Sequence, residues 1–280
     1  MAIYTTKRLR CYRWLCENIR PDYLDDPQPK FIPSTDQDWA EIIYLGSIHG
    51  VLPALYVKLS KAKAHQFIPK DFLEALEGFY ELNSLFNFSL REQILNTTQI
   101  LNNHHINPVW LKGAITLLSP IWETTSRTML DLDLWIPGAD DQLKTLSVLS
   151  DNGYSIQPES VGHDYSLSQH YPPVIKPGQP ARLEVHRSIV ALECSELLGN
   201  ELASSQVQWL NNESYTYGIP SEDAQIMQSY LQCTEQASDS MCPRTTPRLM
   251  KMLDFLERFS SKEQLNSWFA SNQAESLPIS

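Results

Sequence analysis

The run MLDLDLWI, Met129 to Ile136, alternates with a period of two. Such alternation predicts a strand, because successive side chains of a strand project to opposite faces. We expect Leu132 and Leu134 on one face, and Asp131 and Asp133 together on the other. Two carboxylates this close repel each other, which a fold tolerates when a cation lies between them. Oxygen ligands of this kind suit Mg²⁺ or Mn²⁺, although a solvated strand face would carry the same pair.

A second alternating run, Arg182 to Ser188, supplies a third carboxylate. Leu183 and Val185 are expected to face the core, and the opposite face is expected to carry Arg182, Glu184 and His186. If this strand lies beside the first, three carboxylates converge, which is the ligand set for two metal ions about 3.5–4 Å apart. We expect His186 to orient Glu184, to contact the substrate or to be a satisfied histidine, because histidine rarely binds ions of the magnesium type.

A tight turn precedes the aspartates. The β-rich run Ile106 to Leu111 ends at Lys112-Gly113, and a helical pattern begins at Ala114. Gly113 would let a phosphate approach the backbone, the helix would offer free N–H groups, and Lys112 would add a point charge to a triphosphate. Arg127 stands four residues before the first aspartate, where it would bind a phosphate, bind the carboxylates or form a structural salt bridge.

Helical patterns frame this part of the chain. Tyr165 to Ile175 and Arg182 to Ser188 are expected to form a hairpin across a Pro- and Gly-rich turn. His163, Asp164 and His170 are interpreted as loop or strand residues, with substrate contact left open. The expected helices are Trp39–Leu45, 70–103, Asp140–Ser150, Ser221–Cys233 and Pro247–Phe259. The predicted organisation is an N-terminal helical region (1–103), an α/β core (104–190) and a C-terminal helical region (191–280).

The composition is that of a globular protein, with 42% hydrophobic and 20% charged residues. The net charge of −11 disfavours a broad nucleic-acid-binding surface, which needs an excess of Lys and Arg. Five cysteines without a C-x-x-C pair favour reduced thiols over disulfides or a zinc knuckle. No run suits a membrane span or a secretory signal. We expect a cytoplasmic protein without a membrane partner, and leave export through a receptor-read signal open.

The order and spacing of several motifs resemble one known family, the uncharacterised bacterial nucleotidyltransferases of the polymerase-beta-like superfamily. Two upstream segments also resemble this family, Asp38-Trp39 and the run His49 to Pro53. The resemblance therefore covers about residues 35 to 260. The motifs that match are Leu111-Lys112-Gly113, Arg127, Asp131-Leu132-Asp133-Leu134, Gly153-Tyr154, His170-Tyr171-Pro172-Pro173 and Glu184-Val185-His186.

The resemblance implies an α+β fold, in which a small mixed β-sheet core is flanked by N-terminal and C-terminal helices. It also implies that Asp131, Asp133 and Glu184 are metal carboxylates that hold Mg²⁺ or Mn²⁺. The broader superfamily usually has Gly-Ser in the turn, whereas an alanine follows the glycine here. The narrower family commonly has Lys-Gly, which implies that Lys112 takes over the contact with the triphosphate.

The function expected from these residues is transfer of a nucleoside monophosphate from a nucleoside triphosphate, such as ATP, to an acceptor hydroxyl, with release of pyrophosphate. Lys112, Gly113 and Arg127 would bind the nucleotide. The acceptor is left open among protein, RNA and small molecules. Two alternatives stand beside this hypothesis: a catalytically inactive nucleotide sensor or interaction scaffold, and a phosphodiesterase or other hydrolase that uses the same metals.

Overall fold

The computed structural model describes residues 6–22, 32–61, 68–121, 125–189, 205–211, 214–235 and 249–273. The chain forms two compact units, one made of residues 1–80 with 233–280 and the other of residues 81–232. All of the candidate site residues belong to the second unit. The division into three regions expected from the sequence stays a prediction.

The first unit is helical. Its core contains the aromatic rings of Trp14, Trp39 and Phe72, whose centroids lie 4.6 to 6.5 Å apart. A capping box begins its second helix, because Asp38 N donates to Thr35 Oγ1 and Thr35 N donates to the Asp38 carboxylate. The helices are α1 (Thr6–Ile19), α2 (Asp36–His49), α3 (Leu52–Lys61), the first turns of α4 (Lys70–Asn102), α9 (Leu249–Leu256) and α10 (Lys262–Gln273).

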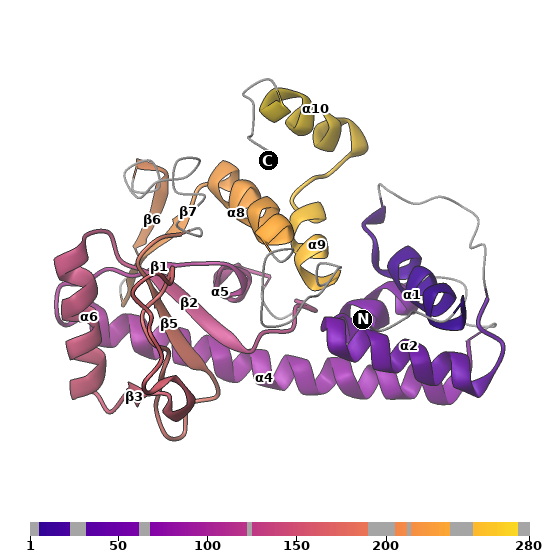
Figure 1. The fold of residues 1–280 in the computed structure, drawn as a ribbon, viewed down its shortest axis with the longest axis horizontal. Helices are drawn as coiled ribbons and strands as arrows, with labels where there is room; N and C mark the ends of the chain where they lie inside the picture. The colour runs from indigo at the N-terminus through magenta and orange to yellow at the C-terminus, as the bar shows by residue number, and fades with distance from the viewer. Residues whose placement is uncertain are drawn as a thin grey trace. The chain divides into compact units, whose positions relative to one another are not determined.

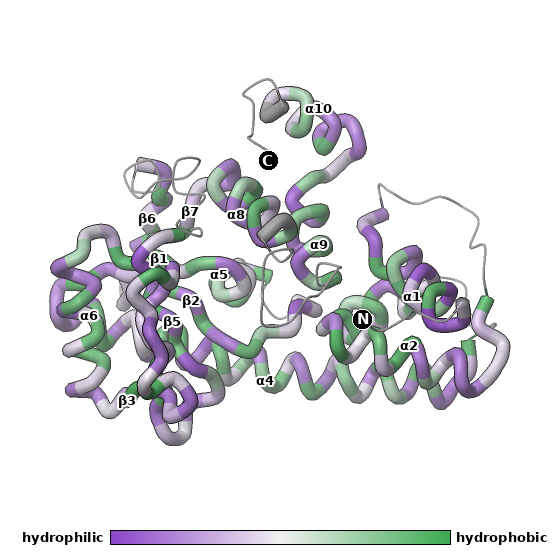
Figure 2. Tube along the Cα trace, viewed as in Figure 1, coloured by the Kyte–Doolittle hydropathy of each residue, from purple (hydrophilic) through white to green (hydrophobic). Residues whose placement is uncertain are grey.

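Helix α4 confirms the long helix predicted from residue 70 to about 103. Hydrophobic and hydrophilic residues are interspersed along its whole length (Figure 2), as in an amphipathic helix. In the second unit Leu90, Ile94 and Leu101 are fully buried against the sheet. The helix therefore supplies one wall of the core on which the sheet lies.

The second unit is built on a seven-stranded mixed sheet in the order β3-β4-β5-β2-β1-β7-β6. The strands β2 and β5 lie side by side within it (Figure 1), and β4 and β5 form the expected hairpin. Its strands are β1 (Val109–Trp110), β2 (Asp131–Trp135), β3 (Ser155–Ile156), β4 (Val174–Ile175), β5 (Arg182–His186), β6 (Val207–Asn211) and β7 (Thr216–Pro220). Its helices besides α4 are α5 (Gly113–Leu118), α6 (Ala139–Asp151), the short 3-10 helix η4 (Pro158–Ser160) and α8 (Glu222–Glu235). The α+β fold with helices on both sides of a mixed sheet is thus confirmed.

The two faces of the sheet differ in what they bury. Leu132 and Leu134 of β2, with Leu183 and Val185 of β5, join the core formed with α4, α5 and α6. On the opposite face Trp135 packs in a smaller cluster that includes residues of α8. The period-two alternation predicted for both strands is confirmed, and the acidic side chains consequently share the face of Trp135.

Two expectations about the strands are wrong. The strand predicted from Tyr165 to Ile175 is limited to β4 and one bridge at His170, because the preceding backbone turns inward to meet the Arg187 guanidinium. The helical pattern expected after residue 190 is interrupted by β6 and β7, which extend the sheet beyond β1.

Candidate functional site

The parallel pairing of β2 with β5 brings the predicted carboxylates together. Asp131 lies opposite Arg182 and Asp133 lies opposite Glu184 in the register of the two strands. Residues paired in this way project from the same face of a sheet. The juxtaposition expected if the two strands were neighbours is therefore present.

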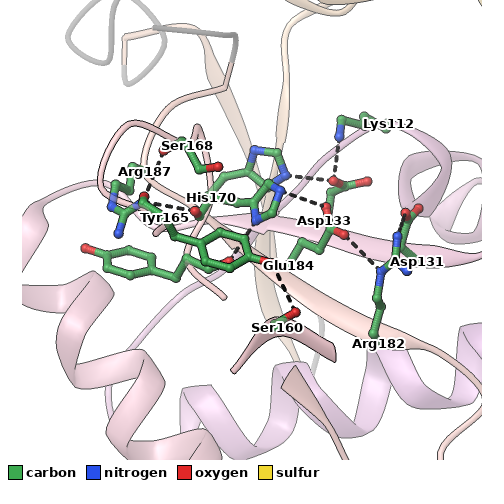
Figure 3. A network of polar contacts seen from close by, with 12 residues as sticks. Lys112, Asp131, Asp133, Ser160, Tyr165, Ser168, His170, Arg182, Glu184 and Arg187 are labelled. Atoms are coloured by element: carbon green, nitrogen blue, oxygen red, sulfur yellow. Dashed lines mark hydrogen bonds and ion pairs between the residues drawn. The ribbon is translucent and has the colours of Figure 1, made fainter. Parts of the chain in front are cut away.

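Asp133 lies at the centre of the site. The Lys112 side chain reaches Asp133 (Figure 3), where Nζ lies 2.5 Å from Oδ1. Nε2 of His186 lies 2.7 Å from the same oxygen. Asp133 is 4% exposed and His186 is fully buried. Burial opposes the charge of Asp133, but the Lys112 ammonium and the His186 contact outweigh it and lower the pKa of the carboxyl. Burial likewise opposes the charge of Lys112, yet the carboxylates around it, Asp133 foremost, raise the pKa of the ammonium.

Arg182 connects the other two carboxylates. Its Nη2 donates to Asp131 Oδ2 and its Nε donates to Glu184 Oε1, both at 3.0 Å. Partial burial opposes the guanidinium charge, but Glu184 and Asp131 outweigh burial and raise the pKa of Arg182. The sequence placed Arg182 on this face without a role, because only the pairing of the two strands shows that it bridges both acids.

The loop before β4 adds a histidine to the site. Arg187 Nη1 donates to the carbonyl oxygens of Tyr165, Ser168 and His170 at 2.7 to 3.0 Å (Figure 3). The guanidinium also lies 3.9 Å from the centre of the Tyr171 ring. Held in this way, His170 places Nε2 3.7 Å from Oε2 of Glu184. Arg187 was missed by the sequence analysis, since an arginine that binds backbone carbonyls leaves no pattern in the sequence.

The turn before α5 is of type II′. Lys112 has φ 51° and ψ −125°, and Ala114 N donates to the Leu111 carbonyl at 3.2 Å. Glycine usually occupies the position that Lys112 holds. The next residue, Gly113, is needed for a different reason, because an added Cβ would lie 2.1 Å from Arg127 Nη1 and 2.5 Å from Met129 Sδ.

Arg127 thus lies against the turn that contains the other two predicted nucleotide-binding residues. Its backbone carbonyl accepts hydrogen bonds from the side-chain amides of Asn83 and Asn87 of α4, at 3.3 and 3.1 Å. The Arg127 side chain occupies the space beside Gly113 through which a phosphate was expected to approach the backbone. A phosphate at this place would therefore meet the guanidinium rather than the Gly113 backbone.

One known protein family matches most of the chain. The model of a family described as "Uncharacterised nucleotidyltransferase" matches residues 35–273. The chain belongs to this family. Among curated proteins and solved structures, none matches the chain significantly. Membership makes nucleotidyl transfer the general reaction class of this nucleotidyltransferase.

The nucleotidyltransferase has a group of side chains able to hold a metal ion. One ligand atom each from Asp133, Glu184 and His186 lies within 4.8 Å of the others, and all three residues are buried. In the part of the chain that the structure describes, Oδ2 of Asp133 and Oδ1 of Asp131 accept no hydrogen bond. Oxygen atoms therefore remain for a hard cation, and the residues fit such an ion. Asp131 lies outside the closest group, and its side chain is 36% exposed.

Within the described ranges of this nucleotidyltransferase, no helix combines the length and the apolar character needed to cross a membrane.

Proposed function

We propose that the protein transfers a nucleoside monophosphate from a nucleoside triphosphate to an acceptor hydroxyl. The observation that carries this proposal is the register of β2 and β5, which places Asp133 opposite Glu184 and leaves Asp131 on the same face. Membership of a nucleotidyltransferase family supports it independently. In the reaction the acceptor oxygen bonds to the α-phosphorus, the bond from that phosphorus to the bridging oxygen breaks, and pyrophosphate leaves.

The carboxylates of Asp131, Asp133 and Glu184 would hold two Mg²⁺ or Mn²⁺ ions. When bound, such ions supply positive charge to the triphosphate oxygens and favour ionisation of the acceptor hydroxyl. Glu184, with one oxygen bonded to Arg182 and the other near His170, would help to accept the proton of that hydroxyl. The chain then contributes mainly by positioning the groups and by electrostatic stabilisation.

We assign the binding of the triphosphate to basic side chains near the carboxylates. Lys112 lies in the turn before α5 and Arg127 packs against Gly113, so the two side chains would bind the triphosphate and balance charge on the leaving pyrophosphate. ATP is the simplest nucleotide to test, with the acceptor among protein, RNA and small molecules. We place the reaction in the cytoplasm, where free thiols such as Cys11, Cys16 and Cys233 stay reduced.

One observation favours a second function. Lys112 and Arg182 form ion pairs with all three carboxylates of the site through the contacts described above, and this leaves one negative charge in place of three. A face whose charge is largely offset by its own side chains suits a nucleotide-binding sensor or scaffold that does not turn over. This alternative predicts binding of nucleotide without release of pyrophosphate.

The two functions are separated by incubating the purified protein with each α-labelled nucleoside triphosphate, Mg²⁺ or Mn²⁺ and host lysate. We expect a labelled product whose formation falls by roughly 100-fold or more in Asp131→Asn and Asp133→Asn. Asp131→Asn is the decisive variant, because its side chain is partly exposed and its loss leaves the buried Lys112–Asp133 pair intact. Asp151→Asn, an exposed change at the end of α6, is the matched control and should form the labelled product at the wild-type level.

Full activity of Asp131→Asn and Asp133→Asn would refute the assignment. Nucleotide binding without product would favour the sensor, and nucleotide consumption without acceptor would favour a hydrolase.

A further inference from the structure

Both ring nitrogens of His186 face oxygen atoms that only accept hydrogen bonds. Nδ1 lies 3.1 Å from the backbone carbonyl oxygen of Ser188, and Nε2 lies 2.7 Å from the carboxylate oxygen Oδ1 of Asp133. The ring is fully buried, so water does not satisfy either nitrogen. A neutral imidazole carries one N–H and one lone pair. One of the two contacts therefore sets a lone pair against a lone pair.

A second proton on the ring would relieve that conflict at the cost of another buried charge. Lys112 already places its ammonium 2.5 Å from the same oxygen of Asp133. Two cations would then meet at a single desolvated carboxylate oxygen, and burying charge without matching partners is expensive. A metal ion at Nε2 resolves the conflict differently, because it accepts the lone pair of the nitrogen and attracts the carboxylate.

The contact of Nδ1 fits this role. A histidine that binds metal almost always donates its other ring N–H to a carboxylate, a backbone carbonyl or water, which fixes the tautomer. The Ser188 carbonyl oxygen, 3.1 Å from Nδ1 of His186, is an acceptor of this kind for the tautomer that leaves the lone pair on Nε2. That nitrogen lies within the group formed with Asp133 and Glu184. The buried strand β5 supplies two of these three residues.

We propose that His186 Nε2 binds the metal ion directly, beside the carboxylates of Asp133 and Glu184, and that this nitrogen makes the site prefer Mn²⁺ to Mg²⁺. Imidazole suits transition-metal ions, whereas Mg²⁺ takes oxygen ligands and retains its waters. The inference deepens the function proposed above by naming one ligand and the metal preference, and it does not require turnover.

His170 is the rival ligand. Its Nδ1 lies 2.7 Å from the carbonyl oxygen of Tyr171, so its Nε2 is also available, but that atom is 3.7 Å from Glu184 and outside the closest group. The ring centroids of His170 and His186 are 5.6 Å apart. A matched pair of variants, His186→Gln and His170→Gln, therefore distinguishes the two histidines at nearly the same place.

The test is pulsed electron paramagnetic resonance of the full chain loaded with Mn²⁺, without nucleotide. We expect a ¹⁴N coupling from a directly bound imidazole, which becomes a ¹⁵N coupling in protein labelled with [¹⁵N]histidine. The coupling should vanish in His186→Gln and persist in His170→Gln. Titration calorimetry should show Mn²⁺ affinity falling roughly 10- to 100-fold in His186→Gln, with Mg²⁺ affinity changed less than about threefold.

Two results would overturn the inference: no nitrogen coupling in the labelled wild-type protein, or a coupling that survives in His186→Gln and is lost in His170→Gln. The labelled wild type decides whether a histidine binds the ion. If His186→Gln fails to fold, which circular dichroism would reveal, a ¹⁵N coupling that persists in labelled His170→Gln still excludes the rival ligand. Absence of nucleotidyl transfer would bear on the proposed function alone, since this measurement contains no nucleotide. Transfer supported by Mg²⁺ in a protein without the coupling would reject the histidine ligand and leave the proposed function standing.

Discussion

Lys112 combines a buried ion pair with an unfavourable backbone conformation. Its φ of 51° is one of two positive values among the described non-glycine residues, and the combination with ψ −125° is one that glycine adopts more easily. The ammonium nonetheless lies on Asp133. Backbone strain of this kind persists where the surrounding structure fixes it, and it concentrates at functional sites.

Two substitutions separate the strain from the charge. Both Lys112→Gly and Lys112→Ala remove the ammonium, but only glycine relaxes the backbone. We expect the free energy of unfolding of Lys112→Gly to exceed that of Lys112→Ala by about 1 kcal/mol, measured by urea denaturation. Glycine is ordinarily the less stable choice because it gains entropy in the unfolded chain. A lower stability for the glycine variant would show that the turn is not strained at this position.

The site was predictable where alternation alone decides which face a residue occupies. Asp131 and Asp133 share a face because they stand two apart on one strand, and the same holds for Glu184 and His186. The bridging role of Arg182 was not predictable, since it depends on the register between strands that lie 51 residues apart. The positive φ at the turn was equally hidden, because lysine carries no preference for it.

At the scale of elements, α4 holds the beginning of β5 through one side chain. Gln93 Nε2 donates to the Ala181 carbonyl at 2.8 Å, and Ala181 N donates to Gln93 Oε1 at 3.1 Å. Both bonds are buried, and Ala181 directly precedes the strand that carries Glu184. The amide of Gln93 therefore positions half of the site from the helix behind the sheet.

Removing this amide should destabilise the protein. Gln93→Ala leaves a buried backbone N–H and a buried C=O without partners, so we expect the free energy of unfolding to fall by roughly 2–4 kcal/mol. Gln99→Ala, an exposed change in the same helix, should alter it by less than about 0.5 kcal/mol. Denaturant unfolding followed by circular dichroism checks both. An equal decrease in the free energy of unfolding for both variants would mean that the Gln93 amide stabilises the fold no more than an exposed glutamine does.

Long elements with clear periodicity were predictable, and short ones that depend on distant partners were not. Helix α4 follows from apolar spacing maintained over 33 residues. The strands β6 and β7, of five residues each, escaped notice because their pairing with each other and with β1 decides their state. The segment from Tyr165 to Gln169 looked like a strand, yet its carbonyl groups turn towards Arg187.

For the whole molecule, acid should weaken the fold through two groups of the site. Burial, together with the charge of Lys112, lowers the pKa of His186, so the folded state binds fewer protons there than the unfolded state. The pKa of Asp133 is also lowered, as described above. Stability from His186 is present above the unfolded pKa of about 6.5, and that from Asp133 above about 3.9. Each contribution is lost as the pH falls below these values towards the folded pKa.

We therefore expect the free energy of unfolding in the presence of EDTA to decrease between pH 7 and pH 5. The contribution of His186 to this slope is at most about 1.4 kcal/mol per pH unit. His186→Gln should lose less stability over the same interval, because glutamine does not titrate. Parallel curves for the wild type and His186→Gln would contradict the lowered pKa of the histidine. Asp133→Asn removes a carboxylate that raises the pKa of His186, so its free energy of unfolding should fall between pH 7 and pH 5 at least as steeply as that of the wild type.

The register between β2 and β5 has a consequence for how the protein is made. Asp133 leaves the ribosome 53 residues before His186, which at about 5–20 residues per second is an interval of roughly 3–10 s. Lys112 has already been synthesised by then, so the nascent chain carries a counter-ion for Asp133 before Glu184 exists. Metal ions in the surrounding fluid thus meet no complete ligand set on the growing chain until translation has passed β5.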